Sequence, residues 1–224
     1  MFKVAHRGAS GYEPENTILA FEKALELQVD IIELDARLCK TGELVILHDE
    51  DLKRTTDGEG LVHFKSIEEL KLLNAGKTET IPTLIEALNY LNQQCQVNIE
   101  LVSKGAGAAT AELLKSNKWQ LDNILISSFR INELKALNSL IPDVRLGYLA
   151  MEITSKQAKE LRQLNFYSIG LEKNCLKKDV FVQLHDMGLK IFVFTVNDVE
   201  EIEHFARMGV DGIISDYPDR ISQF

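Results

Sequence analysis

The stretch VDIIELD, residues 29–35, joins a short apolar run to two carboxylates. Its β-branched and aliphatic side chains predict a strand that is buried in the core. Successive side chains of a strand point to opposite faces, so Glu33 and Asp35 lie on the same face as Ile31. Two carboxylates thus leave a buried strand in one direction, which is costly unless they reach solvent, pair with cations or bind a metal.

Similar apolar runs recur along the chain and predict eight strands, near Val4, Ile31, Val97, Ile124, Val144, Ile169, Ile191 and Gly212. Most are separated by segments with a 3.6-residue apolar period, which predicts helices over Thr17–Leu27, Leu134–Leu140, Gln157–Leu164 and Val199–Met208. Regular alternation of strand and helix favours a parallel sheet with helical crossovers. Eight such units predict an α/β fold of the (β/α)₈ TIM-barrel type rather than an open doubly wound sheet.

The interval after the second predicted strand is roughly twice as long as the others. It contains a returning strand at Leu44–Leu47 and a short helix near Ile67–Leu73, within a polar and irregular segment. This predicts a small insertion at the barrel rim, covering about residues 49–82. Because no Ser-, Gly- or Pro-rich linker divides the chain, residues 1–224 are predicted to form a single barrel domain.

Composition and charge place the chain among ordinary globular proteins. The 224 residues are 45% hydrophobic and 26% charged, which excludes collagen-like, low-complexity and disordered classes. Lys and Arg number 25 against 34 Asp and Glu, which gives a net charge of −9, and no basic cluster offsets it locally. The sequence therefore predicts no nucleic acid partner.

Possible membrane spans, secretory signals and cysteine spacing indicate where the protein resides and whether it forms disulfides. No apolar run approaches the roughly 18 residues that a membrane helix requires, so no membrane span is predicted. The first residues lead directly into a predicted strand without the apolar stretch of a secretory signal, which predicts a cytoplasmic location. Cys39, Cys95 and Cys175 are odd in number and lack a C-x-x-C spacing, so they are predicted to be buried free thiols. A homo-oligomer is neither indicated nor excluded.

A third carboxylate, Glu100, follows the apolar strand at Val97. Consecutive barrel strands lie side by side, so Glu33, Asp35 and Glu100 are predicted to converge at the C-terminal rim, where barrel active sites lie. A site made only of oxygen ligands selects a hard divalent cation, Mg²⁺ or Ca²⁺, over zinc. The alternative is that the carboxylates form rim salt bridges with Arg7, Arg37 or Lys104.

Two histidines end apolar runs close to these carboxylates. His6 ends the first predicted strand, and His48 ends the returning strand of the insertion just before Asp49. A lone histidine in such a place is usually structural, but two near a carboxylate cluster indicate an acid–base pair. Arg7 is predicted either to bind a phosphate oxygen or to act as counter-ion to Glu33 or Asp35.

Several of these motifs stand together in an order and spacing that resembles a known family. They are His6-Arg7-Gly8, Pro14-Glu15-Asn16-Thr17, Glu33-Leu34-Asp35, His48-Asp49, Arg54-Thr55-Thr56, Asn98-Ile99-Glu100, Ser127-Ser128-Phe129, Thr195-Val196-Asn197 and Gly209-Val210-Asp211-Gly212. The set is similar to that of the glycerophosphodiester phosphodiesterases and covers nearly the whole chain.

The resemblance implies a barrel with a small insertion after its second strand. It implies that Glu33, Asp35 and Glu100 are metal ligands for one Mg²⁺ or Ca²⁺ and that His6 and His48 are the catalytic acid and base. The implied substrates are small phosphodiesters such as glycerophosphocholine or glycerophosphoethanolamine, hydrolysed to glycerol 3-phosphate and an alcohol. Such a reaction would belong to lipid and glycerol metabolism.

The chain departs from the family pattern at Val102, where many members carry a lysine two residues after the glutamate. Lys104 lies one pleat further, roughly 6.6 Å along an extended strand, and is predicted to replace that lysine as a substrate contact. The alternative is that Lys104 is solvated and that Arg7 binds the phosphate. Two other functions stay open: a phosphodiesterase that stops at a cyclic phosphate, and a catalytically silent barrel that binds phosphodiesters or partner proteins.

Overall fold

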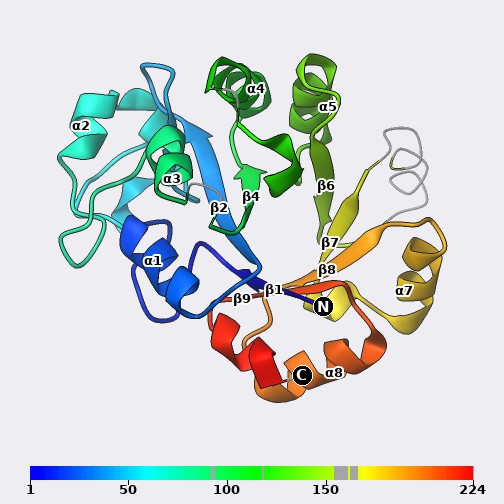
Figure 1. The fold of residues 1–224 in the computed structure, drawn as a ribbon. Coiled ribbons are helices and arrows are strands. Elements are labelled where there is room, and N and C mark those ends of the chain that lie inside the picture. Colours follow the sequence, from blue (N-terminus) through cyan, green and yellow to red (C-terminus); the bar gives the residue numbers. More distant parts are fainter. Residues whose placement is uncertain (92–93, 118, 154–160, 162–165, 224) are drawn as a thin grey trace.

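The fold is that of a computed structural model, which describes residues 1–91, 94–117, 119–153, 161 and 166–223. Within these residues, strands and helices alternate as the sequence predicts (Figure 1). Eight parallel strands form the sheet: β1 (Phe2–Ala5), β2 (Ile31–Leu38), β4 (Gln96–Leu101), β5 (Ile124–Ser128), β6 (Arg145–Ala150), β7 (Ser168–Glu172), β8 (Lys190–Phe194) and β9 (Gly212–Ser215). Because β1 pairs with both β2 and β9, the sheet closes, and the predicted TIM barrel is confirmed.

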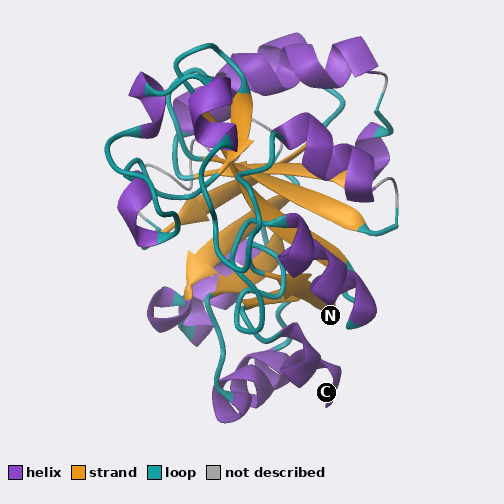
Figure 2. Cartoon of the chain, turned by 90° about the vertical axis from the view of Figure 1, so that its left-hand side faces the viewer, coloured by secondary structure: helices purple, strands orange, loops and turns teal. Residues whose placement is uncertain are grey.

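Helices surround the closed sheet, as Figure 2 shows from the side. They are α1 (Ile18–Glu26), α3 (Leu84–Leu91), α4 (Ala106–Asn117), α5 (Ile131–Leu140), α7 (Lys178–His185) and α8 (Val199–Met208). The helix predicted at Thr17 begins one residue later, because the Thr17 hydroxyl accepts a hydrogen bond from the Ala20 N–H and so caps the helix. The predicted helix at 157–164 lies outside the described residues, apart from Leu161.

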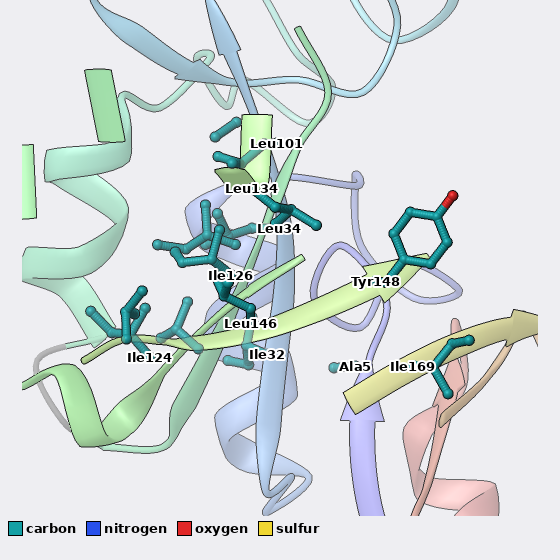
Figure 3. Close-up of a cluster of buried hydrophobic side chains, with 14 of the residues drawn as sticks. Ala5, Ile32, Leu34, Leu101, Ile124, Ile126, Leu134, Leu146, Tyr148 and Ile169 are labelled. Atoms are coloured by element: carbon teal, nitrogen blue, oxygen red, sulfur yellow. The ribbon is translucent and has the colours of Figure 1, made fainter. Parts of the chain in front are cut away.

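The main core lies between the barrel and the helices. Figure 3 shows outward-facing side chains from several strands in contact there, among them Ile32, Leu34, Ile126 and Leu101. Ile32 and Leu34 are completely buried, and burial of each such side chain contributes roughly 1.5–3 kcal/mol. The same alternation that sends these residues outward sends Glu33 and Asp35 into the barrel. The packing of one face of β2 therefore fixes the direction of the carboxylates on the other.

The segment after β2 forms a small unit beside the barrel, drawn largely in cyan in Figure 1. Strand β3 (Leu44–Ile46) pairs antiparallel with the C-terminal end of β2, through Ala36 opposite Ile46. It is followed by the short helices η1 (Leu52–Arg54), η2 (Val62–Phe64) and α2 (Ile67–Lys71). A separate group of buried side chains, including Leu52, Val62 and Leu70, holds the unit together. Pairing with the end of β2 places the unit next to the barrel mouth.

The remaining short elements are η3 (Leu121–Asn123), η4 (Lys173–Cys175) and η5 (Pro218–Gln223). All three cysteines are free, as predicted, but only Cys39 is fully buried, while Cys95 and Cys175 are partly exposed. Among the described helices, none combines the length and the apolar character needed to cross a membrane.

Candidate active site at the barrel mouth

Three carboxylates meet at the C-terminal end of the barrel. Glu33 and Asp35 point inward from β2, and Glu100 points inward from the neighbouring strand β4, where it pairs in register with Asp35. One oxygen from each residue lies within 4.8 Å of the other two. Glu33 and Asp35 are only 2% and 1% exposed. The predicted convergence of the three side chains is therefore present in the structure.

The electrostatics of this cluster favour a bound cation. Burial, together with the nearby charge of Asp35, raises the pKa of Glu100 to about 8 and the pKa of Glu33 well above its usual value. Oxygen Oε1 of Glu33 is buried and accepts no hydrogen bond from the residues that the structure describes. Buried carboxylates with such an orphaned oxygen match the donor set that a hard divalent ion requires. The residues present thus fit a metal ion, with one oxygen available from each of three carboxylates.

Within the described residues, Arg7 is the positively charged side chain that pairs with the carboxylate cluster. Its Nε lies 3.1 Å from Oδ2 of Asp35, and its backbone N–H donates a 2.8 Å hydrogen bond to Oε2 of Glu33. Although burial opposes it, the surrounding carboxylates raise the pKa of the Arg7 guanidinium. Arg7 also pairs with Glu15, at 2.7 Å. The proposed counter-ion role is therefore realised with Asp35, and one guanidinium leaves most of the cluster's charge uncompensated.

His6 is anchored by a carboxylate that lies far away in the sequence. Its Nδ1 is 2.7 Å from Oδ1 of Asp216, which follows β9. Asn197 and Ser10 also donate hydrogen bonds to Asp216. Burial opposes the charge of Asp216, but the contacts with His6, Asn197 and Ser10 hold its pKa at about 2. An ionised carboxylate only accepts hydrogen bonds, so Nδ1 of His6 carries the proton and Nε2 is the unprotonated nitrogen of the neutral ring.

His48 has the same arrangement, with the neighbouring residue Asp49 as its carboxylate. Its Nδ1 is 2.6 Å from Oδ1 of Asp49, and a hydrogen bond from Arg54 lowers the pKa of Asp49. Asp49 thus contacts both His48 and Arg54. The backbone carbonyl of His48 accepts a hydrogen bond from Arg37. His48 is more accessible than His6, with side chains 40% and 20% exposed.

A cavity of about 160 Å³ joins these groups. Its polar lining comes from His6, Arg7, Glu33, His48, Asn98, Glu100 and Thr195. Its apolar lining comes from Phe129, Leu149, Phe194 and Ile214. The rings of Phe129 and Phe194 meet edge to face, with centroids 5.7 Å apart. The cavity is therefore lined both by acid–base groups and carboxylates and by apolar side chains.

Lys104 and Arg37 are the other two predicted salt-bridge partners of the carboxylates, and their surroundings differ from those of Arg7. Strand β4 ends at Leu101, and Lys104 is exposed in the turn before α4, outside the lining of the cavity. Arg37 contacts Glu50 at 3.6 Å and the His48 carbonyl rather than the cluster. Of the three predicted salt-bridge partners, only Arg7 is recorded in an ion pair with the cluster.

Asp216, Asn197, Glu15 and Arg54 belong to the site but were missed as functional residues by sequence reasoning. A partial signal existed for Asp216, because it follows the last apolar run, and the carboxyl ends of parallel strands meet at one end of a barrel. Asn16 braces the cluster: its side chain donates to Asp35 at 2.8 Å and accepts from the Asp35 N–H at 3.2 Å. Its φ of 59° is a left-handed conformation that Asn tolerates.

Fold and site together define a class of protein: a TIM-barrel enzyme with two histidines beside a buried carboxylate cluster at its mouth. Comparison with known proteins gives the particular family. The model of the glycerophosphoryl diester phosphodiesterase family matches residues 6–220. The chain therefore belongs to this family and is an enzyme with glycerophosphodiester phosphodiesterase activity.

Individual relatives agree with this assignment. A glycerophosphodiester phosphodiesterase from Bacillus altitudinis is 36% identical over 231 residues, covering 96% of this chain and 94% of its own length. A phosphodiesterase structure from Oleispira antarctica, in complex with the product sn-glycerol-3-phosphate, is 34% identical with a TM-score of 0.93, covering 98% of this chain and 94% of that one. A glycerophosphodiester phosphodiesterase structure from Thermotoga maritima is 29% identical with a TM-score of 0.84, covering 100% and 98% of the two chains.

Proposed function

We propose that this enzyme hydrolyses small glycerophosphodiesters, such as glycerophosphocholine or glycerophosphoethanolamine, to glycerol 3-phosphate and an alcohol. The observation that carries the proposal is the convergence of two carboxylate-anchored histidines with Glu33 and Glu100 on one cavity, with Asp35 completing the carboxylate cluster. The product bound by the Oleispira antarctica relative supports glycerol 3-phosphate as the phosphate-containing product.

Glu33, Asp35 and Glu100 would hold one divalent cation, Mg²⁺ or Ca²⁺. When bound, such an ion stabilises the negative charge that develops on the phosphoryl oxygens. Arg7 lines the cavity and is the proposed phosphate contact from the protein. Lys104 is proposed as a second contact, which requires its flexible side chain to fold back from the turn after β4.

His6 and His48 exchange protons with the substrate through their Nε2 atoms. Neutral His6, the less exposed of the two, takes the proton of the attacking water as the new P–O bond forms. Protonated His48 gives its proton to the leaving alkoxide as the P–O bond to the alcohol breaks. Asp216 and Asp49 hold the two rings in the required tautomer and stabilise each imidazolium when it forms. The more open position of His48 suits the side from which the alcohol departs.

The test is turnover of metal-depleted protein with glycerophosphocholine, glycerophosphoethanolamine and a bis-phenyl phosphodiester, followed by ³¹P NMR of the products. Chelation should abolish turnover, and Mg²⁺ or Ca²⁺ should restore it. Glu33→Gln and Asp35→Asn should each weaken metal affinity while the protein stays folded, and Glu112→Gln, on the exposed face of α4, is the matched control.

Full activity after exhaustive chelation, with no metal found by elemental analysis, would contradict the metal site. A cyclic phosphate as the final product would instead support internal attack by a glycerol hydroxyl.

A further inference from the structure

Arg54, at the end of η1, connects the segment after β3 to two different parts of the barrel mouth. Its Nε donates a 2.5 Å hydrogen bond to Oδ2 of Asp49. Its two terminal nitrogens donate to the two carboxylate oxygens of Glu15, at 2.7 and 2.8 Å. Glu15 lies 39 positions away, in the turn before α1. Each of the three guanidinium nitrogens therefore donates to one of two carboxylates.

Each of these carboxylates has a second partner in the site. Asp49 contacts Nδ1 of His48 through its other oxygen, at 2.6 Å. Glu15 accepts a 2.7 Å hydrogen bond from Arg7, whose Nε lies 3.1 Å from Asp35. Charges thus alternate in sign along an unbroken chain of contacts from the carboxylate cluster to His48, with Arg54 in the middle.

The direction of the His48 ring depends on this series of charged contacts, because few other contacts hold the side chain. Strand β3 ends at Ile46, so His48 stands outside the strand ladder on an irregular segment. Its backbone carbonyl is held by Arg37, but among the described residues its ring is hydrogen-bonded to Asp49 alone. Asp49 is in turn exposed enough to rotate unless Arg54 retains its second oxygen.

We propose that Arg54 is a positioning residue, which fixes the Asp49 carboxylate and, through it, the direction of the His48 ring. By holding Glu15 with its other edge, Arg54 also ties His48 to the Arg7 side of the mouth. The inference rests on the proposed acid–base role of His48. A planar fork of five donors can serve two carboxylates in fixed directions, whereas an ammonium is a point charge, so lysine is a poor substitute.

The chain supplies matched controls for this proposal. Lys71 pairs with Glu86 and Lys77 pairs with Glu13, and both pairs tie the same segment to the barrel. Neither pair contacts a histidine of the site. Arg54 is 47% exposed, and the melting temperature of each variant, measured beside its activity, separates a loss of stability from a loss of position. A loss of activity specific to Arg54 would therefore report on position rather than on folding.

The experiment measures kcat and KM for Arg54→Gln, Arg54→Lys, Lys71→Gln and Lys77→Gln, each with excess Mg²⁺ and glycerophosphocholine, whose poor leaving group requires the acid. We expect Arg54→Gln to lower kcat by roughly tenfold or more, because small displacements of catalytic groups cost that much, with KM and melting temperature nearly unchanged. Arg54→Lys should lose most of the same activity. The two lysine controls should stay within about twofold of the parent enzyme.

A double-mutant cycle with His48→Ala gives the decisive readout. If Arg54 acts through His48, then Arg54→Gln lowers kcat in the parent but by less than about twofold in the His48→Ala background. An equal loss in both backgrounds, or no loss in either Arg54 variant, would overturn the inference. Near-normal activity of His48→Ala itself would instead contradict the proposed function. Should Arg54→Gln fail to fold, the cycle is run with Arg54→Lys, and the same outcomes apply.

Discussion

The metal-free enzyme should be destabilised by its own active-site charge, and Glu100→Gln should relieve that strain. The pKa of Glu100 is raised from 4.5 to about 8 by burial first and by Asp35 second. A carboxyl group whose pKa is higher in the folded than in the unfolded chain favours folding below the unfolded pKa. That contribution is lost as the pH rises from 4.5 towards 8, because the unfolded chain ionises more easily than the folded one.

The size of the effect follows from the shift. One pKa unit corresponds to about 1.4 kcal/mol, so ionising Glu100 costs the fold about 3 kcal/mol at pH 7 and about 5 kcal/mol above pH 9. Glutamine has nearly the same volume and no charge, so the variant should lack this cost. For a chain of this length, 3 kcal/mol corresponds to a melting temperature higher by roughly 6–12 °C.

The assay is thermal unfolding of metal-free parent and Glu100→Gln between pH 5 and 9, with Glu112→Gln as the exposed control. The two curves should nearly coincide at pH 5 and separate as the pH rises, with the variant more stable. Saturating Mg²⁺ or Ca²⁺ should stabilise the parent and should have less effect on the variant. A variant that melts at or below the parent temperature at pH 8 without metal would refute the reasoning.

Other perturbations test the remaining groups. His6→Ala and His48→Ala should each lower kcat by roughly 10²-fold or more. A substrate with a nitrophenyl leaving group should restore activity only in the variant that lacks the acid. Equal losses with nitrophenyl and choline esters in both variants would contradict the assignment of either histidine as the acid. Lys104→Ala should lower kcat/KM by roughly tenfold, and adding Val102→Lys to that variant should recover part of the lost kcat/KM. If Lys104→Ala changes kcat/KM by less than about twofold, Arg7 is left as the protein's phosphate contact. Because the pKa of Asp216 falls from 3.8 to about 2 on folding, its charge adds about 2 kcal/mol of stability. That stability is present above pH 4 and lost as the pH falls through 2, so Asp216→Asn should lower the melting temperature at pH 6 and leave it unchanged near pH 2.

Local patterns in the sequence were sufficient for the barrel and for the carboxylate cluster. Alternation along VDIIELD places Glu33 and Asp35 on one face, and this follows from the pleat of any strand. The order of apolar runs and helical segments predicts a closed parallel sheet, and closure places the end of β4 next to the end of β2. Glu100 could therefore be assigned to the same cluster without coordinates.

The partner of His6 and the partner that links Arg54 to the barrel were decided by the tertiary structure. His6 and Asp216 are 210 positions apart, and they meet because β1 and β9 close the barrel side by side. Arg54 reaches Glu15 because the segment after β3 packs against the mouth through its own small core. Apolar periodicity records which face of an element is buried, but an ion pair depends on side-chain directions set by all the elements around it. The sequence alone therefore determined the barrel and which carboxylates line its mouth, whereas only the folded chain decided that Asp216 holds His6 and that Glu15 holds Arg54.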